Sequence, residues 1–187
     1  MPLHLSERAD EAAELLISVR APRCELEGGR AFSVDLRRLL PFVAERRRIV
    51  RLLAESAREH PFDVIAGAGA GLPFAAWLAE LVALPLVVVR DGRVEGELKP
   101  GQRALLASDV LPDPDVLPAL RAAGAICEHV AVVAFDDLSP VALDGRATLH
   151  ALTTSRRLIE SPDIGALFTP AQMKALREFA ANAGAKT

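Results

Sequence analysis

Short apolar runs alternate with helical stripes of hydrophobic residues along most of the chain, and the clearest example lies in its centre. Residues 104–107 form an apolar run that ends at Asp109, and an Ala/Leu-rich stretch then follows a turn and closes at Gly124. A second apolar run, residues 130–134, comes next. Strand, helix and strand in this order predict a parallel sheet with crossover helices. Ligands of such sheets lie beyond the carboxyl ends of the strands, so we expect chemistry in the loop of residues 108–115.

A second unit of the same kind lies upstream. The apolar run 62–66 leads into a glycine-rich segment, then into a helical pattern over residues 74–83 and a strand over 86–90. Glycines let backbone amides approach an anion closely, and the amino end of a helix adds partial positive charge. The segment is therefore a candidate phosphate or pyrophosphate loop, made of Gly67, Ala68, Gly69, Ala70 and Gly71. The alternative is a tight turn in which the glycines permit unusual backbone angles.

The two ends of the chain predict smaller elements, and residues 91–102 a polar, glycine-containing connection. Ser6 begins a helical stripe that runs to about residue 20, and Pro41 opens another that runs to about residue 59. A hairpin around Gly28-Gly29, a short strand at 148–152, a helix capped by Ser155 and a last helix with capping-box spacing from Thr169 to Gln172 complete the pattern.

Composition predicts one domain in a reducing compartment. The chain has 187 residues, of which 51% are hydrophobic, and its net charge of -3 argues against nucleic acid as a partner. Cys24 and Cys127 show no metal-binding spacing. The four histidines, at positions 4, 60, 129 and 150, never fall at ligand spacing along the chain either. On this basis we expect no metal site.

No membrane-spanning segment is predicted. The longest apolar stretch, residues 72–89, is interrupted by Glu80 and divided by Pro73 and Pro85 into a helix and a strand. The first residues lack the basic segment and apolar core of a signal peptide. We therefore expect a cytoplasmic protein.

With these elements placed, the chain resembles type I phosphoribosyltransferases, and among them the orotate phosphoribosyltransferases. Residues 62–73 are similar to the family's strand and pyrophosphate loop, residues 84–90 to the strand ending in an arginine that contacts pyrophosphate, and residues 95–106 to the segment leading into the phosphoribosyl pyrophosphate (PRPP) strand. Asp35-Leu36-Arg37 matches an Asp-x-Arg of the family's amino-terminal hood.

The resemblance implies an α/β fold with a mostly parallel five-stranded sheet, flanking helices and a small hood built from both ends of the chain. It implies a single domain over residues 1–187, with the hood at about 1–40 and 146–187 and the core at about 41–145. It also implies a homodimer, a nucleotide or phosphorylated small molecule as ligand, and Mg²⁺ if PRPP is bound. No other cofactor is expected.

The PRPP motif departs from the family pattern. The family places two acids after the strand and then a Thr-Thr-Gly phosphate loop, whereas here Ser108 replaces the first acid and Asp109 keeps the second. The phosphate loop is replaced by a segment that contains Pro112, Asp113, Pro114 and Asp115. Proline removes a backbone donor, and the two acids put negative charge where a phosphate would lie. The sequence therefore predicts that ordinary PRPP binding is lost.

Two further departures lead to the same prediction. The family's mobile catalytic loop carries lysines and a histidine, but here Arg90 is followed by Asp91-Gly92-Arg93, so that Arg90 and Arg93 alone keep positive charge. A cationic clamp of that kind normally provides much of the transition-state stabilisation. The Asp-Arg pair that reaches the base in orotate enzymes is matched by Asp136-Asp137.

Three hypotheses follow. The first is a non-catalytic or strongly impaired protein with the phosphoribosyltransferase fold. The second is an active phosphoribosyltransferase with an unusual base, in which Arg90 and Asp109 are the candidate catalytic residues and Arg93 assists at the pyrophosphate. The third is a dinucleotide-binding protein, since Gly67-x-Gly69 before a helix resembles that fingerprint, although Leu72 stands where its third glycine belongs.

Overall fold

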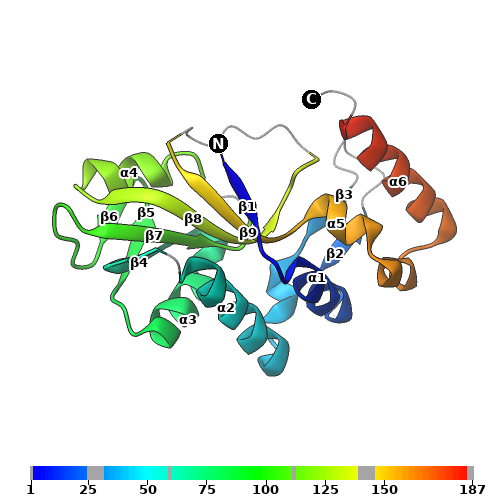
Figure 1. Ribbon diagram of the computed structural model, residues 1–187, viewed down its shortest axis with the longest axis horizontal. Helices are drawn as coiled ribbons and strands as arrows, with labels where there is room; N and C mark the ends of the chain where they lie inside the picture. The colour runs from blue at the N-terminus through cyan, green and yellow to red at the C-terminus, as the bar shows by residue number, and fades with distance from the viewer. Residues whose placement is uncertain (1, 25–31, 59, 111–112, 139–145, 185–187) are drawn as a thin grey trace.

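A seven-stranded, mostly parallel sheet forms the centre of the molecule (Figure 1). The computed structural model describes residues 2–24, 32–58, 60–110, 113–138 and 146–184. The sheet order is β1-β9-β8-β7-β4-β5-β6, and among these strands β6 alone runs antiparallel to its neighbour. The strands are β1 (Leu3–Leu5), β4 (Val64–Ala68), β5 (Leu86–Arg90), β6 (Arg93–Glu95), β7 (Arg103–Ser108), β8 (Ile126–Phe135) and β9 (Thr148–Thr154).

Helices cover both faces of the sheet. In Figure 1, α1, α2 and α3 lie below it and α4 lies above it. Helix α5 packs against β3 of the short hairpin of β2 and β3, and α6 packs against α5. The bounds are α1 (Ala9–Ser18), α2 (Val43–Ala57), α3 (Leu72–Val82), α4 (Val116–Ala122), α5 (Ser155–Glu160), α6 (Pro170–Gly184), β2 (Pro22–Cys24) and β3 (Phe32–Val34), with 3-10 segments η1 (Leu36–Leu39), η2 (Gly69–Gly71) and η3 (Pro162–Ala166).

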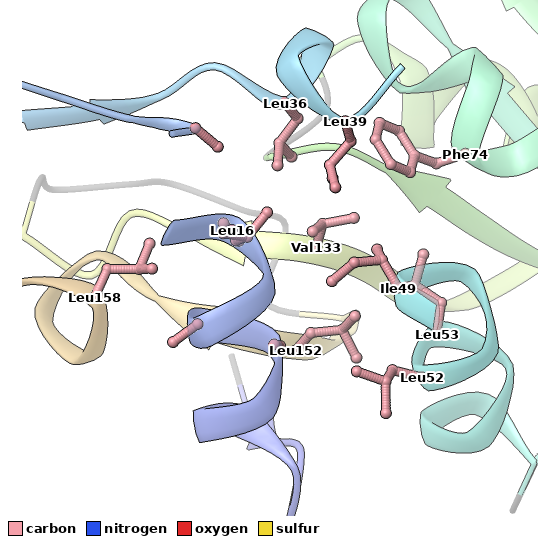
Figure 2. Close-up of a cluster of buried hydrophobic side chains, with 14 of the residues drawn as sticks. Leu16, Leu36, Leu39, Ile49, Leu52, Leu53, Phe74, Val133, Leu152 and Leu158 are labelled. Carbon is pink, nitrogen blue, oxygen red and sulfur yellow. The ribbon is translucent and has the colours of Figure 1, made fainter. Parts of the chain in front are cut away.

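The larger hydrophobic core lies on the face covered by α1, α2 and α3 (Figure 2). Leu16 from α1 and Leu53 from α2 pack in the same cluster as Val133 and Leu152 from the sheet, and Leu158 extends it to α5. A second cluster on the opposite face joins α4 to the alternate residues of the strands. Because successive side chains of a strand point to opposite faces, the continuous apolar runs of β7 and β8 supply both cores at once.

The predicted α/β architecture is confirmed, and the strand count is corrected. The five expected strands correspond to β4, β5, β7, β8 and β9, which run parallel to one another. Two short strands extend them to seven: β1 pairs with β9, and β6 lies in the segment expected to be a loop and pairs with β5. A three-residue strand is too short to show a recognisable alternation, so neither was visible in the pattern.

The smaller elements are present with shifted starts, since α1 begins after its N-cap residue Arg8 rather than at Ser6, and α2 begins at Val43 rather than at Pro41. The hairpin is present as β2 and β3, and the Thr169–Gln172 capping box is formed, with the Thr169 amide donating to the Gln172 side chain at 2.9 Å. The cap of α5 is Thr154 rather than Ser155, because the Thr154 hydroxyl accepts from the Arg157 amide at 3.2 Å. In the described parts of the chain, every helix is too short or too polar to cross a bilayer.

Candidate functional site

The glycine-rich segment forms the last two residues of β4, Gly67 and Ala68, and the compact 3-10 turn Gly69–Gly71 that leads into α3. A methyl group on Gly67 would lie 2.5 Å from the Cβ of Ala75, and one on Gly71 would lie 2.6 Å from the Ser108 hydroxyl oxygen. Gly69 has a φ of +50°, in the left-handed region that favours glycine. Each glycine therefore has a structural role, two in close packing and one in backbone conformation.

This turn also brings the amino end of α3 to the carboxyl edge of the sheet. Gly71 precedes the helix and supplies no side-chain cap, and Pro73 lies in its first turn. The first amides of a helix have no partner within it and carry partial positive charge. The two interpretations of the segment, a tight turn and an anion-facing helix terminus, are thus geometrically compatible.

A cavity of about 540 Å³ lies beside the turn at the ends of β4 and β5, and we call it the carboxyl-edge cavity. Its walls combine the glycine segment, the end of β5 and the loop before α4. The predicted site residues that line it are Ala68, Gly69, Arg90, Asp113, Pro114 and Asp115, together with Asp91 and Gly92. The fold thus brings the pyrophosphate candidate and the altered phosphate loop to one cavity. Pro112 lies outside the described residues.

Acidic side chains outnumber basic ones around the carboxyl-edge cavity. Three carboxylates, from Asp91, Asp113 and Asp115, stand against the single guanidinium of Arg90 among the described lining residues. Arg90 is 63% exposed, and its Nη1 lies 3.8 Å from Oε1 of Glu95 on β6. The cavity is therefore a poor environment for a phosphate anion.

The predicted cationic pair, Arg90 and Arg93, does not face one cavity. Arg93 lies opposite Arg90 in the β5–β6 register and is exposed, but it is not among the described residues that line the carboxyl-edge cavity. The polar segment that carries Arg93 forms β6 instead of a long loop. Arg90 is thus the predicted arginine that the structure brings to this cavity.

Asp109 and Ala70 open onto a different cavity. Its volume is about 640 Å³, and it lies between the end of β7 and the hairpin segment, so we call it the hood cavity. Ser108 is buried, and its hydroxyl donates to Oδ1 of Asp109 at 3.1 Å. The predicted PRPP residues are therefore separated, with Asp109 on the hood side of the glycine turn and Asp113 on the other.

The hood motif supplies the charges on the far wall of the hood cavity. Nε of Arg37 lies 2.8 Å from Oδ1 of Asp35, and Nη2 of Arg23 lies 3.6 Å from Oδ2. The hydrogen bond from Arg37, together with the charges of both arginines, lowers the pKa of Asp35. Two guanidiniums thus share one carboxylate, which leaves this wall with a positive balance.

Asp136 and Asp137, which the resemblance aligns with the family's base-contacting pair, make local hydrogen bonds. Oδ1 of Asp136 accepts from the Leu138 amide at 3.2 Å, and Oδ1 of Asp137 accepts from the Arg156 amide at 2.9 Å. Asp137 also lies 3.8 Å from Nε of Arg156. These carboxylates therefore hold the turn after β8 against the start of α5.

One group of residues was not foreseen from the sequence. His60, His129 and His150, which are far apart along the chain, each offer a ligand atom, and these atoms lie within 4.8 Å of one another. The prediction of no metal site rested on sequence spacing alone. That spacing carries no signal here, because the three residues come from the segment before β4, from β8 and from β9.

Comparisons with known proteins point to one enzyme family. The chain is 32% identical to an orotate phosphoribosyltransferase of Jannaschia sp., over 96% of this chain and 91% of that protein. It is 34% identical to an orotate phosphoribosyltransferase of Cereibacter sphaeroides, over 64% of this chain, and spans 59% of the length of that relative. No family model matches the chain.

Solved structures agree with the fold. Orotate phosphoribosyltransferase from Aeropyrum pernix superposes with a TM-score of 0.66 at 24% identity, over 80% of this chain and 97% of that one. The Mycobacterium tuberculosis enzyme, solved in complex with PRPP, gives a TM-score of 0.61 at 24% identity, over 81% and 98%. These likenesses establish the common fold.

The family assignment rests on the relative from Jannaschia, because the match extends over nearly the full length of both chains. It agrees with the order of strand, glycine turn and helix that the structure displays at β4 and α3. The chain belongs to the orotate phosphoribosyltransferase family, within the type I phosphoribosyltransferases.

Proposed function

We propose that this chain is an orotate phosphoribosyltransferase homologue that no longer transfers phosphoribosyl from PRPP to orotate. The observation that carries the proposal is the charge of the carboxyl-edge cavity. Asp91, Asp113 and Asp115 line it, and Arg90 is the sole basic residue among its described lining residues. A substrate with a 5'-phosphate and a pyrophosphate would meet net negative charge there.

The magnitude of the repulsion supports this proposal. Two unit charges about 4 Å apart interact with about 1 kcal/mol in bulk water and about 4 kcal/mol near a protein surface. A phosphate dianion beside Asp113 and Asp115 would therefore be disfavoured by several kcal/mol. Pro114 has no amide hydrogen to offer, and Arg90 has Glu95 as a neighbour at 3.8 Å.

A second candidate function is transfer to another base, and the hood cavity favours it. Asp109 lines that cavity together with Asp35, Arg23 and Arg37, so two acids and two guanidiniums face a space of about 640 Å³. In this alternative Asp109 faces the ribose hydroxyls or a Mg²⁺ ion that accompanies PRPP. Arg90 would contact the pyrophosphate and Arg93 would assist it.

We further propose that the protein is a cytoplasmic homodimer with a single domain, whose hood comprises residues 1–40 and 146–187. The free thiols of Cys24 and Cys127 fit a reducing compartment. Exposed apolar side chains at Leu40, Phe42 and Val43 provide a surface that a second copy could cover.

Titration calorimetry with PRPP and Mg²⁺, paired with orotate turnover assays, tests the proposed loss of function. We expect the native protein to show neither binding nor turnover. The double variant Asp113→Asn/Asp115→Asn removes two like charges, so it should gain measurable PRPP binding. Asp163→Asn, in η3 and outside both cavities, is the matched control and should behave like the native protein.

Orotate turnover by the native protein would refute the proposal, as would micromolar PRPP binding that the double variant leaves unchanged. No turnover with orotate, together with turnover of another pyrimidine or purine base, would establish the second candidate function, transfer to another base. In that case Asp109→Asn should abolish turnover, while Asp163→Asn should leave it intact.

A further inference from the structure

The histidines gather at the amino edge of the sheet, away from both cavities of the family site. His129 lies near the start of β8 and His150 near the start of β9, and His60 precedes β4. His4 on β1 pairs in register with His150. The carboxyl-edge cavity and Asp109 lie at the other ends of the strands, so this cluster is a separate feature of the fold.

The rings are close enough to share one ion. Nδ1 of His129 lies 2.9 Å from Nε2 of His150, and the rings of His60 and His129 stack with their centroids 4.0 Å apart. One ring nitrogen from each of the three lies within 4.8 Å of the others. Tetrahedral Zn²⁺ with Zn–N bonds of about 2.0–2.1 Å holds its ligand nitrogens about 3.3 Å apart. That spacing lies between the 2.9 Å of the His129–His150 pair and the 4.8 Å within which all three ligand atoms fall, so small ring movements suffice.

We propose that His60, His129 and His150 form a binding site for a divalent transition-metal ion of the zinc type. Three neutral imidazoles suit Zn²⁺, Cu²⁺ or Ni²⁺ and do not suit Mg²⁺ or Ca²⁺, which prefer oxygen ligands. The donor set therefore distinguishes this site from the Mg²⁺ that would accompany PRPP.

His150 is buried, and its ring is hydrogen-bonded to that of His129. His150 is 5% exposed, and burial, followed by the charge of His129, lowers its pKa to about 4. Burial and the neighbouring His60 also lower the pKa of His129. In the hydrogen bond between His129 and His150 one ring nitrogen donates and the other accepts, so the accepting nitrogen carries a lone pair. An acid that would hold the rings as imidazolium ions is missing from their hydrogen bonds within the described residues.

The fourth coordination position would open to solvent. A small cavity of about 110 Å³ lies beside His60 and His129, and Glu128 and Arg103 also line it. His4 stacks on His150 with ring centroids 5.5 Å apart and is exposed, so it lies at the rim and is not one of the three converging ligands. A water molecule could complete a tetrahedral site through this opening.

Zinc titration of the full chain, after metal removal with a chelator, tests the proposal by calorimetry at pH 7. We expect one equivalent of Zn²⁺ to bind with a micromolar or lower Kd. At a free concentration one hundred times Kd, the melting temperature should rise by about 5–10 °C. Co²⁺ in place of Zn²⁺ should give the visible bands of a tetrahedral nitrogen site, without a thiolate charge-transfer band.

Ligand variants and matched controls make the test specific. His60→Gln and His129→Gln should each weaken Zn²⁺ binding by at least about tenfold. His4→Gln and Cys24→Ser should retain the native affinity, because neither residue is among the three ligands. Melting of each variant without metal checks its folding, and His60, which lies outside the strands, provides the decisive variant if a change at His129 in β8 prevents folding.

The proposal is overturned if the native chain binds no Zn²⁺ near stoichiometry, or if His60→Gln and His129→Gln bind it as tightly as the native chain. An equal loss in His4→Gln would also overturn the three-ligand assignment. Binding that disappears in Cys24→Ser alone would identify a thiolate site instead. None of these measurements depends on transferase activity, so the outcome is independent of the proposed function.

Discussion

Replacing Gly67 with alanine would force a methyl group into the contact between β4 and α3. The added Cβ would lie 2.5 Å from the Cβ of Ala75 and 3.1 Å from Cδ1 of Leu72. Ala75 is fully buried, so it cannot move into solvent to make room. Overpacking of this kind typically costs about 1–3 kcal/mol of unfolding free energy. For a chain of this length that corresponds to a melting temperature lower by about 3–10 °C.

A double-mutant cycle isolates that contact. Ala75→Gly removes the methyl group that the new side chain would meet, although by itself it should cost about 1 kcal/mol through helix propensity. If the clash is the cause, the Gly67→Ala/Ala75→Gly protein should be more stable than the sum of the single effects by about 1 kcal/mol or more. Thermal and urea unfolding measure the stability of the native protein, both single variants and the double variant, in buffer free of phosphate and sulfate.

Gly165→Ala is the matched control for this cycle. A Cβ at Gly165 would meet no heavy atom within 4 Å, so its effect should stay within about 0.5 kcal/mol. Additive single effects, or a Gly67→Ala protein as stable as the native one, would refute the packing explanation of this glycine. An anion-binding role would then be the better explanation of Gly67.

Three further predictions concern single side chains. Thr154→Ala should lower the unfolding free energy by about 1 kcal/mol, because the hydroxyl that caps the Arg157 amide is lost; Thr154→Ser should restore it, and equal stabilities in urea would contradict the cap. Burial raises the pKa of Cys127 to about 11, so a disulfide reagent at pH 8 should label Cys24 in the native state and both thiols after denaturation, and rapid native labelling of Cys127 would contradict its burial. Ser108→Asp should be less stable than Ser108→Asn by about 1–3 kcal/mol at pH 7, since it buries a charge beside another acid, and equal melting temperatures would contradict this.

The parallel core was predictable because its signals are local. The apolar run at residues 86–90 matches β5 residue for residue, and the glycine segment after β4 leads into α3 as expected. The two strands that the pattern missed, β1 and β6, are defined by their hydrogen bonds to adjacent strands. The strand at Leu3–Leu5 is exposed along its length and is defined by pairing with β9, which no local alternation could reveal.

The candidate site was predictable only as a set of loops at one edge of the sheet. Residues after parallel strands had to meet there, and Gly69, Arg90 and Asp113 do so around one cavity. That Asp109 faces the hood cavity instead depends on the packing of Gly71 against Ser108, which fixes how the chain leaves β7. A contact between segments that are distant in the sequence produces no recognisable pattern in either segment, so it could not be predicted from the sequence.

The two edges of the sheet should act independently. Leu105 of β7 pairs with His129, and Ser108 lies three residues further on, which is about 10 Å along the strand, with the cavity acids beyond it. Across about 15 Å, with water and salt between them, a bound Zn²⁺ and the two acids Asp113 and Asp115 would interact by a few tenths of a kcal/mol. The Asp113→Asn/Asp115→Asn protein should therefore bind Zn²⁺ within about twofold of the native chain. A tenfold change would mean that a conformational coupling, rather than direct electrostatics, connects the histidine cluster to the carboxyl-edge cavity.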